Sequence, residues 1–349
     1  MNIYTGMSDT NTTDVLCDFR SDTVTRPDAA MRQVMADADV GDDVYGEDPQ
    51  VNLLEGELSE RLGKEAGLFL PTGTQSNLAS LLAHCGRGDE AIVGDQYHIY
   101  HDEAAGASVL GGIALFAIPT MVNGALDPAD ITAAIKDDDP HYARSRLLCL
   151  ENTVSGQAID LDQIRACTNA GRAAGLSVHL DGARFFNAIT ALECDAPDLA
   201  GLSDTVSVCL SKGLGAPAGS VLVGPKDVIA RARRYRKMLG GAMRQSGVLA
   251  AAGRHTLAYH VAGLKDDHQR AAHFGAALIA LGAGDVKIAS NMVFFTPADG
   301  VHGPMREALA AKGIVIGGQA PTIRMVLHRD INDASLEYAI SGFRQFFGD

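Results

Sequence analysis

The sequence lacks the features that define several large classes of protein. No apolar segment approaches the roughly 20 residues that a membrane-spanning helix requires. The 29 basic residues are outnumbered by 43 acidic ones, and the formal charge of −14 has the wrong sign for a general nucleic-acid-binding protein. The N-terminus has no basic segment followed by an apolar stretch, so no secretory signal is expected. We therefore expect a soluble, cytoplasmic protein whose partners include neither a membrane nor a nucleic acid.

Paired cysteines are also missing. None of the six cysteines forms a Cys-x-x-Cys pair, and several, such as Cys149 and Cys209, lie inside apolar runs. This arrangement is typical of small buried hydrophobic residues, and it indicates neither a disulfide framework nor a thiolate zinc site.

Several catalytic motifs are absent as well. The glycine-rich segment 213–219 lacks the Gly-x-Gly-x-x-Gly spacing of a dinucleotide-binding turn, and the chain has no phosphate-binding loop, Gly-x-Ser-x-Gly elbow or His-Glu-x-x-His. His98 and His101, with Asp102 and Glu103 beside them, have a spacing that permits a metal site. Nothing elsewhere in the sequence completes such a site, and we predict no metal.

What is present is a long alternation of short apolar runs and helical patterns. With 349 residues the chain has room for about two domains. Residues 1–17 are polar and aperiodic, which predicts a loose extension. The apolar runs that predict strands are 67–70, 91–93, 115–118, 147–150, 176–180, 206–210 and 221–223. The helical patterns between and around them are 52–62, 76–84, 127–135, 160–174 and 226–238. Such alternation predicts an α/β fold with a mainly parallel sheet that is covered on both faces.

The pattern changes near residue 251. A helical stretch over 254–281 is followed by apolar runs at 292–295, 314–316 and 323–327, with helices over 305–312 and 334–347. We therefore predict a large domain over 18–250 and a small C-terminal α/β domain over 251–349.

Three segments lie where the ends of predicted strands meet. Asp181 follows the run that ends at Leu180, and Lys212 follows another buried run. Carboxyl ends of such strands are where α/β sheets bind ligands, and a lysine there can act as an imine-forming nucleophile. In the third segment, 70–77, a strand ends in a Gly/Thr turn that opens a helix, which is a ready anion site.

Together these segments suit pyridoxal 5′-phosphate (PLP). The turn would hold the phosphate, Asp181 would keep the pyridine nitrogen protonated, and Lys212 would carry the aldehyde carbon. Each segment also has a plainer interpretation: Asp181 as a turn residue, Lys212 as a surface residue and 72–77 as a helix cap. The coincidence of all three at strand ends favours the cofactor.

The sequence further resembles the threonine aldolases of the β-eliminating lyase group, which have the aspartate-aminotransferase-like fold of type I PLP enzymes. The matching segments are Asp18–Pro27, Gly41–Gly46, Pro71–Gln75, Glu151–Thr153, Asp181–Asn187, Ser211–Gly215, Gly240–Gly247 and Arg324. The resemblance runs from about residue 18 to the C-terminus. It implies a PLP-dependent carbon–carbon lyase in a homotetramer built as a dimer of dimers.

The resemblance also implies roles for individual residues. Catalysis and cofactor binding would involve Lys212, His98 stacked over the cofactor ring, and Asp181 at the pyridine nitrogen. The phosphate would lie against Gly73 and Thr74, with Arg244 supplied by a neighbouring subunit. The substrate carboxylate would be held by Ser21, Arg184 and Arg324, of which Arg184 would also contact the cofactor. Tyr45 would approach from the partner chain.

The implied reaction splits a 3-hydroxy amino acid, L-threonine or L-allo-threonine by default, into glycine and an aldehyde. It requires a general base that reaches the β-hydroxyl directly or through one water. At this point the chain departs from the family, because Val154 stands where a histidine commonly faces that hydroxyl. Asp102 likewise stands where an apolar or aromatic residue is usual, four residues after His98 and on the same face of any helix there.

Two interpretations of these departures stay open. Either the pocket has drifted, or it has changed to receive a polar or cationic 3-hydroxy amino acid, with Asp102 contacting the side chain. Other PLP reactions on the same scaffold, such as β-elimination and transamination, are the nearest alternatives. A cofactor-binding regulator without turnover is disfavoured, because residues 1–17 are too short for a DNA-binding domain.

Overall fold

The computed structural model describes residues 15–318 and 321–348, and it divides the chain into two compact units. One unit is Arg26–Ala262, and the other combines the segment up to Thr25 with the segment from Gly263 onward. Most of the predicted N-terminal extension, residues 1–14, lies outside the described residues. Within its remainder, Cys17–Asp18 form a short strand, β1, which pairs with β11 (Ile314–Val315) in the second unit. The domain boundary after residue 250 stays a prediction, and the two units divide at Ala262 instead.

The larger unit is built on a seven-stranded sheet with the order β2-β8-β7-β6-β5-β3-β4. Its strands are β2 (Ala66–Leu70), β3 (Asp89–Gly94), β4 (Ala114–Ile118), β5 (Arg144–Glu151), β6 (Ser177–Gly182), β7 (Thr205–Cys209) and β8 (Ser220–Gly224). Each corresponds to a predicted apolar run. Six of them are almost fully buried over their apolar runs, as strands covered on both faces require, whereas the edge strand β4 is partly exposed.

One strand runs against the others. β8 is antiparallel to both of its neighbours, β2 and β7, while the neighbouring pairs among β7, β6, β5, β3 and β4 are parallel. The predicted mainly parallel α/β fold is therefore confirmed. Because β2 is antiparallel to β8, it points in the same direction as β7. The carboxyl ends of β2, β3, β5, β6 and β7 accordingly share one edge of the sheet, together with the first residue of β8.

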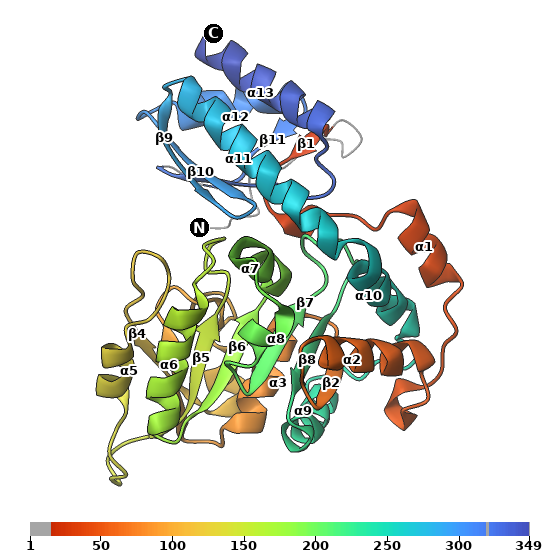
Figure 1. Cartoon of the computed structure of the whole chain (residues 1–349), viewed down its shortest axis with the longest axis vertical. Coiled ribbons are helices and arrows are strands. Elements are labelled where there is room, and N and C mark those ends of the chain that lie inside the picture. The colour runs from red at the N-terminus through yellow and green to blue at the C-terminus, as the bar shows by residue number, and fades with distance from the viewer. Residues whose placement is uncertain (1–14, 319–320, 349) are drawn as a thin grey trace. The chain divides into compact units, whose positions relative to one another are not determined.

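Helices cover both faces of this sheet (Figure 1). The helices of this unit are α1 (Ala29–Ala36), which packs against α10, and α2 (Pro49–Arg61), α3 (Gly73–His84), α4 (His98–His101), α5 (Pro128–Ala134), α6 (Leu161–Ala173), α7 (Phe185–Leu192), α8 (Ala196–Ala200), α9 (Lys226–Met238) and α10 (Gly247–Tyr259). Shorter 3₁₀ and π turns are Asp43–Tyr45 and Ala107–Gly111. Helices α3 and α9 share a buried cluster with β2 and β8, in which Leu70, Ala79, Leu222 and Val228 take part. This packing fixes the start of α3 against the end of β2.

The second unit is a small α/β body with its own core. A three-stranded antiparallel sheet of β9 (Gly284–Ala289), β10 (Met292–Pro297) and β12 (Ile323–Val326) is accompanied by α11 (Leu264–Ala280), α12 (His302–Ala310) and α13 (Asp333–Phe347). Buried residues such as Phe19, Phe274, Phe295 and Phe343 join these elements in one cluster.

The single helical stretch predicted over 254–281 is wrong. Helix α10 ends at Tyr259, a 3₁₀ turn spans Val261–Gly263, and α11 begins at Leu264. The break falls at a β-branched residue and a glycine, Val261 and Gly263, both of which have weaker helix propensity than the alanines around them.

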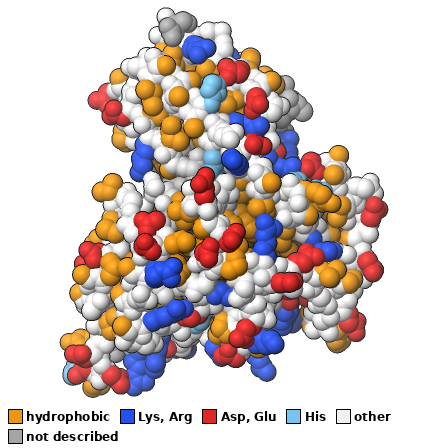
Figure 2. All heavy atoms as spheres, in the orientation of Figure 1, with side chains coloured by type: hydrophobic (Ala, Val, Ile, Leu, Met, Phe, Trp, Pro, Cys, Tyr) orange, Lys and Arg blue, Asp and Glu red, His pale blue; other side chains and the backbone are white. Residues whose placement is uncertain are grey.

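None of the described helices combines the length and apolar character needed to span a bilayer. On the face shown in Figure 2, acidic and basic side chains are interspersed.

Candidate active site

The predicted site residues of the large unit gather at the edge where the strand ends meet. Asp181 is the penultimate residue of β6, Lys212 follows β7, and Gly73 begins α3 shortly after β2. His98 begins α4 after β3, and Glu151 is the last residue of β5. The strand register sets Glu151 opposite Asp181, so two carboxyl groups occupy adjacent strand ends.

Asp181 is 2% exposed and held from both sides. The Ala183 amide donates to its Oδ1 at 2.9 Å, and the Asn77 side-chain amide donates to its Oδ2 at 2.8 Å. A Cβ atom on Gly182 would lie 2.7 Å from the Ser207 carbonyl oxygen, so strands β6 and β7 approach this closely only with glycine there. The motif Asp181-Gly182 thus places the carboxylate and permits the packing beneath it.

Asn77, on α3, joins Asp181 to two further side chains. Its amide nitrogen also donates to Glu103 Oε1 at 2.7 Å, and its oxygen lies 3.1 Å from Nε2 of His179. Complete burial lowers the pKa of His179 to about 3, so this ring is neutral. Since the Asn77 oxygen can only accept, Nε2 of His179 carries the proton and donates it. The orientation of the Asn77 amide is therefore fixed, with its nitrogen toward the two carboxylates.

His98 is anchored by the same group of acids. Its ring Nδ1 lies 2.8 Å from Glu103 Oε1, and its backbone amide donates to Glu151 Oε2 at 2.7 Å. The hydrogen bond with Glu103 is the main cause that raises the pKa of His98, while burial raises the pKa of Glu103 and of Glu151. Asp181 adds to both carboxyl shifts through like-charge repulsion.

Lys212 lies half-buried in a tight turn. The Gly215 amide donates to the Lys212 carbonyl at 2.8 Å, and the Ala216 amide donates to the Leu210 carbonyl at 3.0 Å. The Lys212 charge lowers the pKa of both His98 and Glu151, so its ammonium lies within electrostatic range of the cluster around Asp181.

An anion cradle lies at the start of α3. The Thr72 hydroxyl caps the helix by accepting from the Gln75 amide at 3.1 Å, and the first-turn amides of Gly73 and Thr74 precede it. Ser220, the first residue of β8, lies opposite Leu70 in the register. Its hydroxyl is fully buried, has no hydrogen-bond partner among the described residues, and lies 3.6 Å from where a Cβ of Gly73 would stand.

These residues fit PLP. A buried hydroxyl beside two helix N-terminal amides offers donors to a phosphate, and a buried carboxylate offers an acceptor to a pyridinium nitrogen. Lys212 lies within electrostatic range of His98 and Glu151, which adjoin that carboxylate. The His98, Glu103 and Asp181 ligand atoms lie within 4.8 Å of one another, which would also admit a cation. The Asn77 amide already donates to both the Glu103 and the Asp181 carboxylate, however, so the oxygen lone pairs that would bind a cation accept these hydrogen bonds instead. His101 belongs to neither of the metal-like clusters found among the described residues.

The two residues that depart from the family pattern lie in different surroundings. Asp102 is the C-cap of α4, and its amide donates to the His98 carbonyl at 2.8 Å. Its side chain is 58% exposed and lies 3.2 Å from the His101 ring nitrogen Nδ1. Val154 is buried, and its Cβ lies 2.7 Å from where a Cβ of Gly124 would stand.

The remaining predicted residues are placed as follows. Arg184 is half-buried at the start of α7. Within this chain Arg244 donates to Asp42 at 3.0 Å, and Tyr45 is 76% exposed on the neighbouring 3₁₀ turn. Ser21 and Arg324 belong to the second unit, where Ser21 accepts from the Thr23 amide and Arg324 is an exposed residue of β12.

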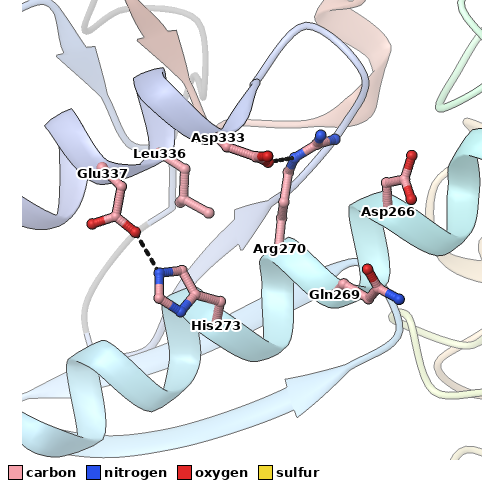
Figure 3. Close-up of a pocket in the computed structure, with 7 residues that line it drawn as sticks. All are labelled: Asp266, Gln269, Arg270, His273, Asp333, Leu336 and Glu337. Carbon is pink, nitrogen blue, oxygen red and sulfur yellow. Dashed lines mark hydrogen bonds and ion pairs between the residues drawn. The ribbon is translucent and has the colours of Figure 1, made fainter.

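A separate pocket lies in the second unit between α11 and α13 (Figure 3). Two pairs line it: Arg270 donates to Asp333 at 2.7 Å, and His273 lies 2.6 Å from Glu337. Because these side chains already bond to one another, the pocket offers less to a ligand than the buried cluster around Asp181.

Comparison with known proteins agrees with this geometry. The family model described as "Beta-eliminating lyase" matches residues 18–298. The chain belongs to this family. The resemblance to threonine aldolases is confirmed: the low specificity L-threonine aldolase of Escherichia coli K12 is 44% identical over 331 residues, which cover 95% of this chain and 99% of that protein.

Further relatives of this β-eliminating lyase resemble it in sequence or in fold. A probable low-specificity L-threonine aldolase 2 of Arabidopsis thaliana is 41% identical over 97% of this chain and 99% of its own length. The threonine aldolase structure of Leishmania major superimposes with a TM-score of 0.80 at 22% identity, covering 95% of this chain and 99% of that one. The predicted aspartate-aminotransferase-like fold of type I PLP enzymes is likewise confirmed.

Sequence reasoning missed Asn77, Glu151 and Ser220 as members of the site, and it considered Glu103 only as a metal ligand. The available signal was local: polar residues such as Asn77 stand on a helix whose surroundings are apolar, and such residues need partners when buried.

Proposed function

We propose that this lyase is a PLP-dependent aldolase that cleaves L-threonine, L-allo-threonine or a related 3-hydroxy amino acid into glycine and an aldehyde. The observation that carries the proposal is the fixed acceptor at the sheet edge: Asp181 is buried and held by two donors, and Lys212 lies within electrostatic range of the neighbouring His98 and Glu151. The sequence identity of 44% and 41% with L-threonine aldolases, over nearly the whole chain, supports this aldol cleavage.

The chain's own residues divide the work of holding the cofactor. Bound to Lys212, PLP supplies an electron sink for the pair released when the Cα–Cβ bond breaks. Asp181 would keep the proton on the pyridine nitrogen, and Asn77 keeps Asp181 oriented. His98 would pack over the ring, with Glu103 fixing the imidazole through Nδ1.

We assign the phosphate to Gly73, Thr74 and Ser220, with Arg244 contributed by a neighbouring subunit. Because Arg244 is half exposed and lies close to the segment that carries Tyr45, both can reach a partner. We propose a cytoplasmic homotetramer, organised as a dimer of dimers, in which Tyr45 enters the partner's site. Light scattering coupled to size-exclusion chromatography tests the tetramer. The variant Tyr45→Ala tests whether Tyr45 contributes to the partner's site.

The substrate carboxylate is assigned to Ser21, Arg184 and Arg324, since a guanidinium binds both carboxylate oxygens. Arginine-to-lysine variants at 184 and 324 separate charge from this planar geometry. If the assignment holds, KM for the amino acid rises in both variants, while the affinity for PLP changes little at Arg324→Lys.

The side-chain pocket is assigned to Asp102 and Val154. Valine cannot accept the proton of the β-hydroxyl, so that proton leaves to another group or to water. The Asp102 carboxylate is exposed to solvent, so it can contact a polar or cationic group of the substrate. Turnover of threonine and of larger cationic 3-hydroxy amino acids should be compared with Asp102→Ala alongside. Selective loss on the cationic substrates supports the assignment, and equal loss on every substrate contradicts it.

The reaction type is tested by product analysis with the cofactor-loaded protein and L-threonine. We expect equal amounts of glycine and acetaldehyde, and no activity in Lys212→Ala. Formation of ammonia with a 2-oxo acid would instead identify β-elimination, and consumption of an added 2-oxo acid would identify transamination.

A further inference from the structure

Three side chains of the larger unit that take no part in the site above converge on one point. They are Asp28, just before α1, and His255 and His260, at the end of α10. One ligand atom from each lies within 4.8 Å of the others. The two rings meet edge to face with centroids 5.0 Å apart. We propose that Asp28, His255 and His260 form a binding site for a divalent transition metal of the zinc class.

The tautomer of His260 favours a metal ligand. Its Nδ1 lies 2.7 Å from the Leu214 carbonyl oxygen, which can only accept, so Nδ1 carries a proton. The other ring nitrogen, Nε2, then faces Asp28. Histidines that bind metals commonly donate their second nitrogen to a backbone carbonyl in this way, which fixes the ring and increases its basicity.

The distance between the first two ligands fits a tetrahedral site. His260 Nε2 lies 3.3 Å from Asp28 Oδ2, whereas a charge-assisted N–H···O bond is usually about 2.7–2.9 Å. With metal–ligand bonds of about 2.0–2.1 Å, the edge of a tetrahedron is about 3.3–3.4 Å. The pair therefore stands at the separation that two ligands of one zinc ion would take.

The carboxylate is also held in place from behind. The Met31 amide donates to Asp28 Oδ1 at 2.8 Å, as part of the cap of α1, and this leaves Oδ2 toward His260. His255 is half-buried on α10, with its ring 4.8 Å from that of Tyr259, and one of its ring nitrogens supplies the third ligand atom of the cluster. The site is partly open, since the Asp28 side chain is 39% exposed, so water can fill the fourth position.

Two imidazoles and one carboxylate select the metal by chemical class. Imidazole suits zinc, copper, nickel and iron, whereas magnesium and calcium prefer oxygen ligands. The bound ion would join three segments: the cap of α1, the end of α10 and, through Leu214, the turn that carries Lys212. Its role is therefore structural, and the inference does not depend on which reaction the enzyme catalyses.

The test uses the cofactor-loaded protein, freed of metal with a chelator and titrated with zinc by calorimetry. We expect one zinc per chain, weaker binding of cobalt, and no competition by magnesium. His255→Gln and His260→Gln should each weaken zinc binding at least about tenfold, and Asp28→Asn should do the same while preserving the cap, since asparagine caps helices well. His273→Gln, which changes a histidine of the second unit that pairs with Glu337, should leave the affinity unchanged.

X-ray absorption at the zinc edge gives a readout that does not depend on folding stability alone. The wild type should show two imidazole ligands, and His255→Gln should show one. The proposal is overturned if zinc fails to bind, if it binds the three variants as tightly as the wild type, or if the bound ion has no imidazole ligand. Each of these three results would leave His260 and Asp28 as a simple ion pair.

Discussion

The substitution Ser220→Ala should change cofactor affinity and protein stability in opposite directions. The Ser220 hydroxyl is fully buried and has no hydrogen-bond partner among the described residues, yet it lies beside the first turn of α3. A buried, unsatisfied hydroxyl costs about 1–3 kcal/mol, and a hydrogen bond to a charged group is worth about 1.5–3 kcal/mol. The same hydroxyl is thus unfavourable without a phosphate and favourable with one.

From these magnitudes, Ser220→Ala should stabilise the cofactor-free protein by about 1 kcal/mol and weaken PLP binding about 10- to 150-fold. Chemical denaturation of the cofactor-free protein gives the first quantity. Titration of PLP, followed by its absorption, gives the second.

Ser207→Ala is the matched control, because its hydroxyl lies on the adjacent strand and donates to Ser76 at 2.7 Å. It should lose about 1–3 kcal/mol of stability, because the buried Ser76 hydroxyl loses this partner, without a change in PLP affinity. If Ser220→Ala behaves like this control in both assays, the hydroxyl does not serve the phosphate and the reasoning is refuted.

Two further predictions follow from the packing and charges of the site. Glu103→Gln should lower the pKa of His98, because the hydrogen bond with Glu103 is the main cause of its rise. A raised pKa stabilises the fold below the unfolded value of about 6.5 and is lost as pH rises through the folded value, so the stability deficit of this variant should be largest in acid and shrink with increasing pH. A deficit that grows with pH in thermal unfolding would contradict this. Gly182→Ala should lose about 1–3 kcal/mol, because its Cβ would stand 2.7 Å from the Ser207 carbonyl oxygen, whereas Gly56→Ala, with nothing within 4 Å on α2, should gain about 0.5–1 kcal/mol. Equal effects in denaturant titrations would show that the strands at Gly182 can separate.

The elements that carry the site could be predicted because strands buried on both faces leave a strong trace in sequence. The runs that end at Leu70, Leu180 and Leu210 are mainly apolar, and the residues that follow them mark the edge where ligands bind. Pattern alone therefore located Asp181 and Lys212 at one edge of an α/β sheet.

Other features leave no such trace. The direction of β8 is invisible because an apolar run reads the same either way, and with it the place of Ser220 beside Gly73 was lost. β9 is a mostly exposed strand with Asp285 and Lys287 on it, so it has no apolar run to detect. The contacts of Asn77 with Glu103 and Asp181 join residues 26 and 104 positions apart, which only the folded chain brings together.

If Lys212 carries PLP beside Asp181 for cleavage that releases glycine, visible absorption of the purified protein before and after addition of glycine should show it. We expect an absorption band of lysine-bound cofactor that gives way to a band at longer wavelength with glycine. Lys212→Ala should lack the first band. Absence of any cofactor band after incubation with PLP, or the same band in Lys212→Ala, would show that Lys212 does not carry the cofactor.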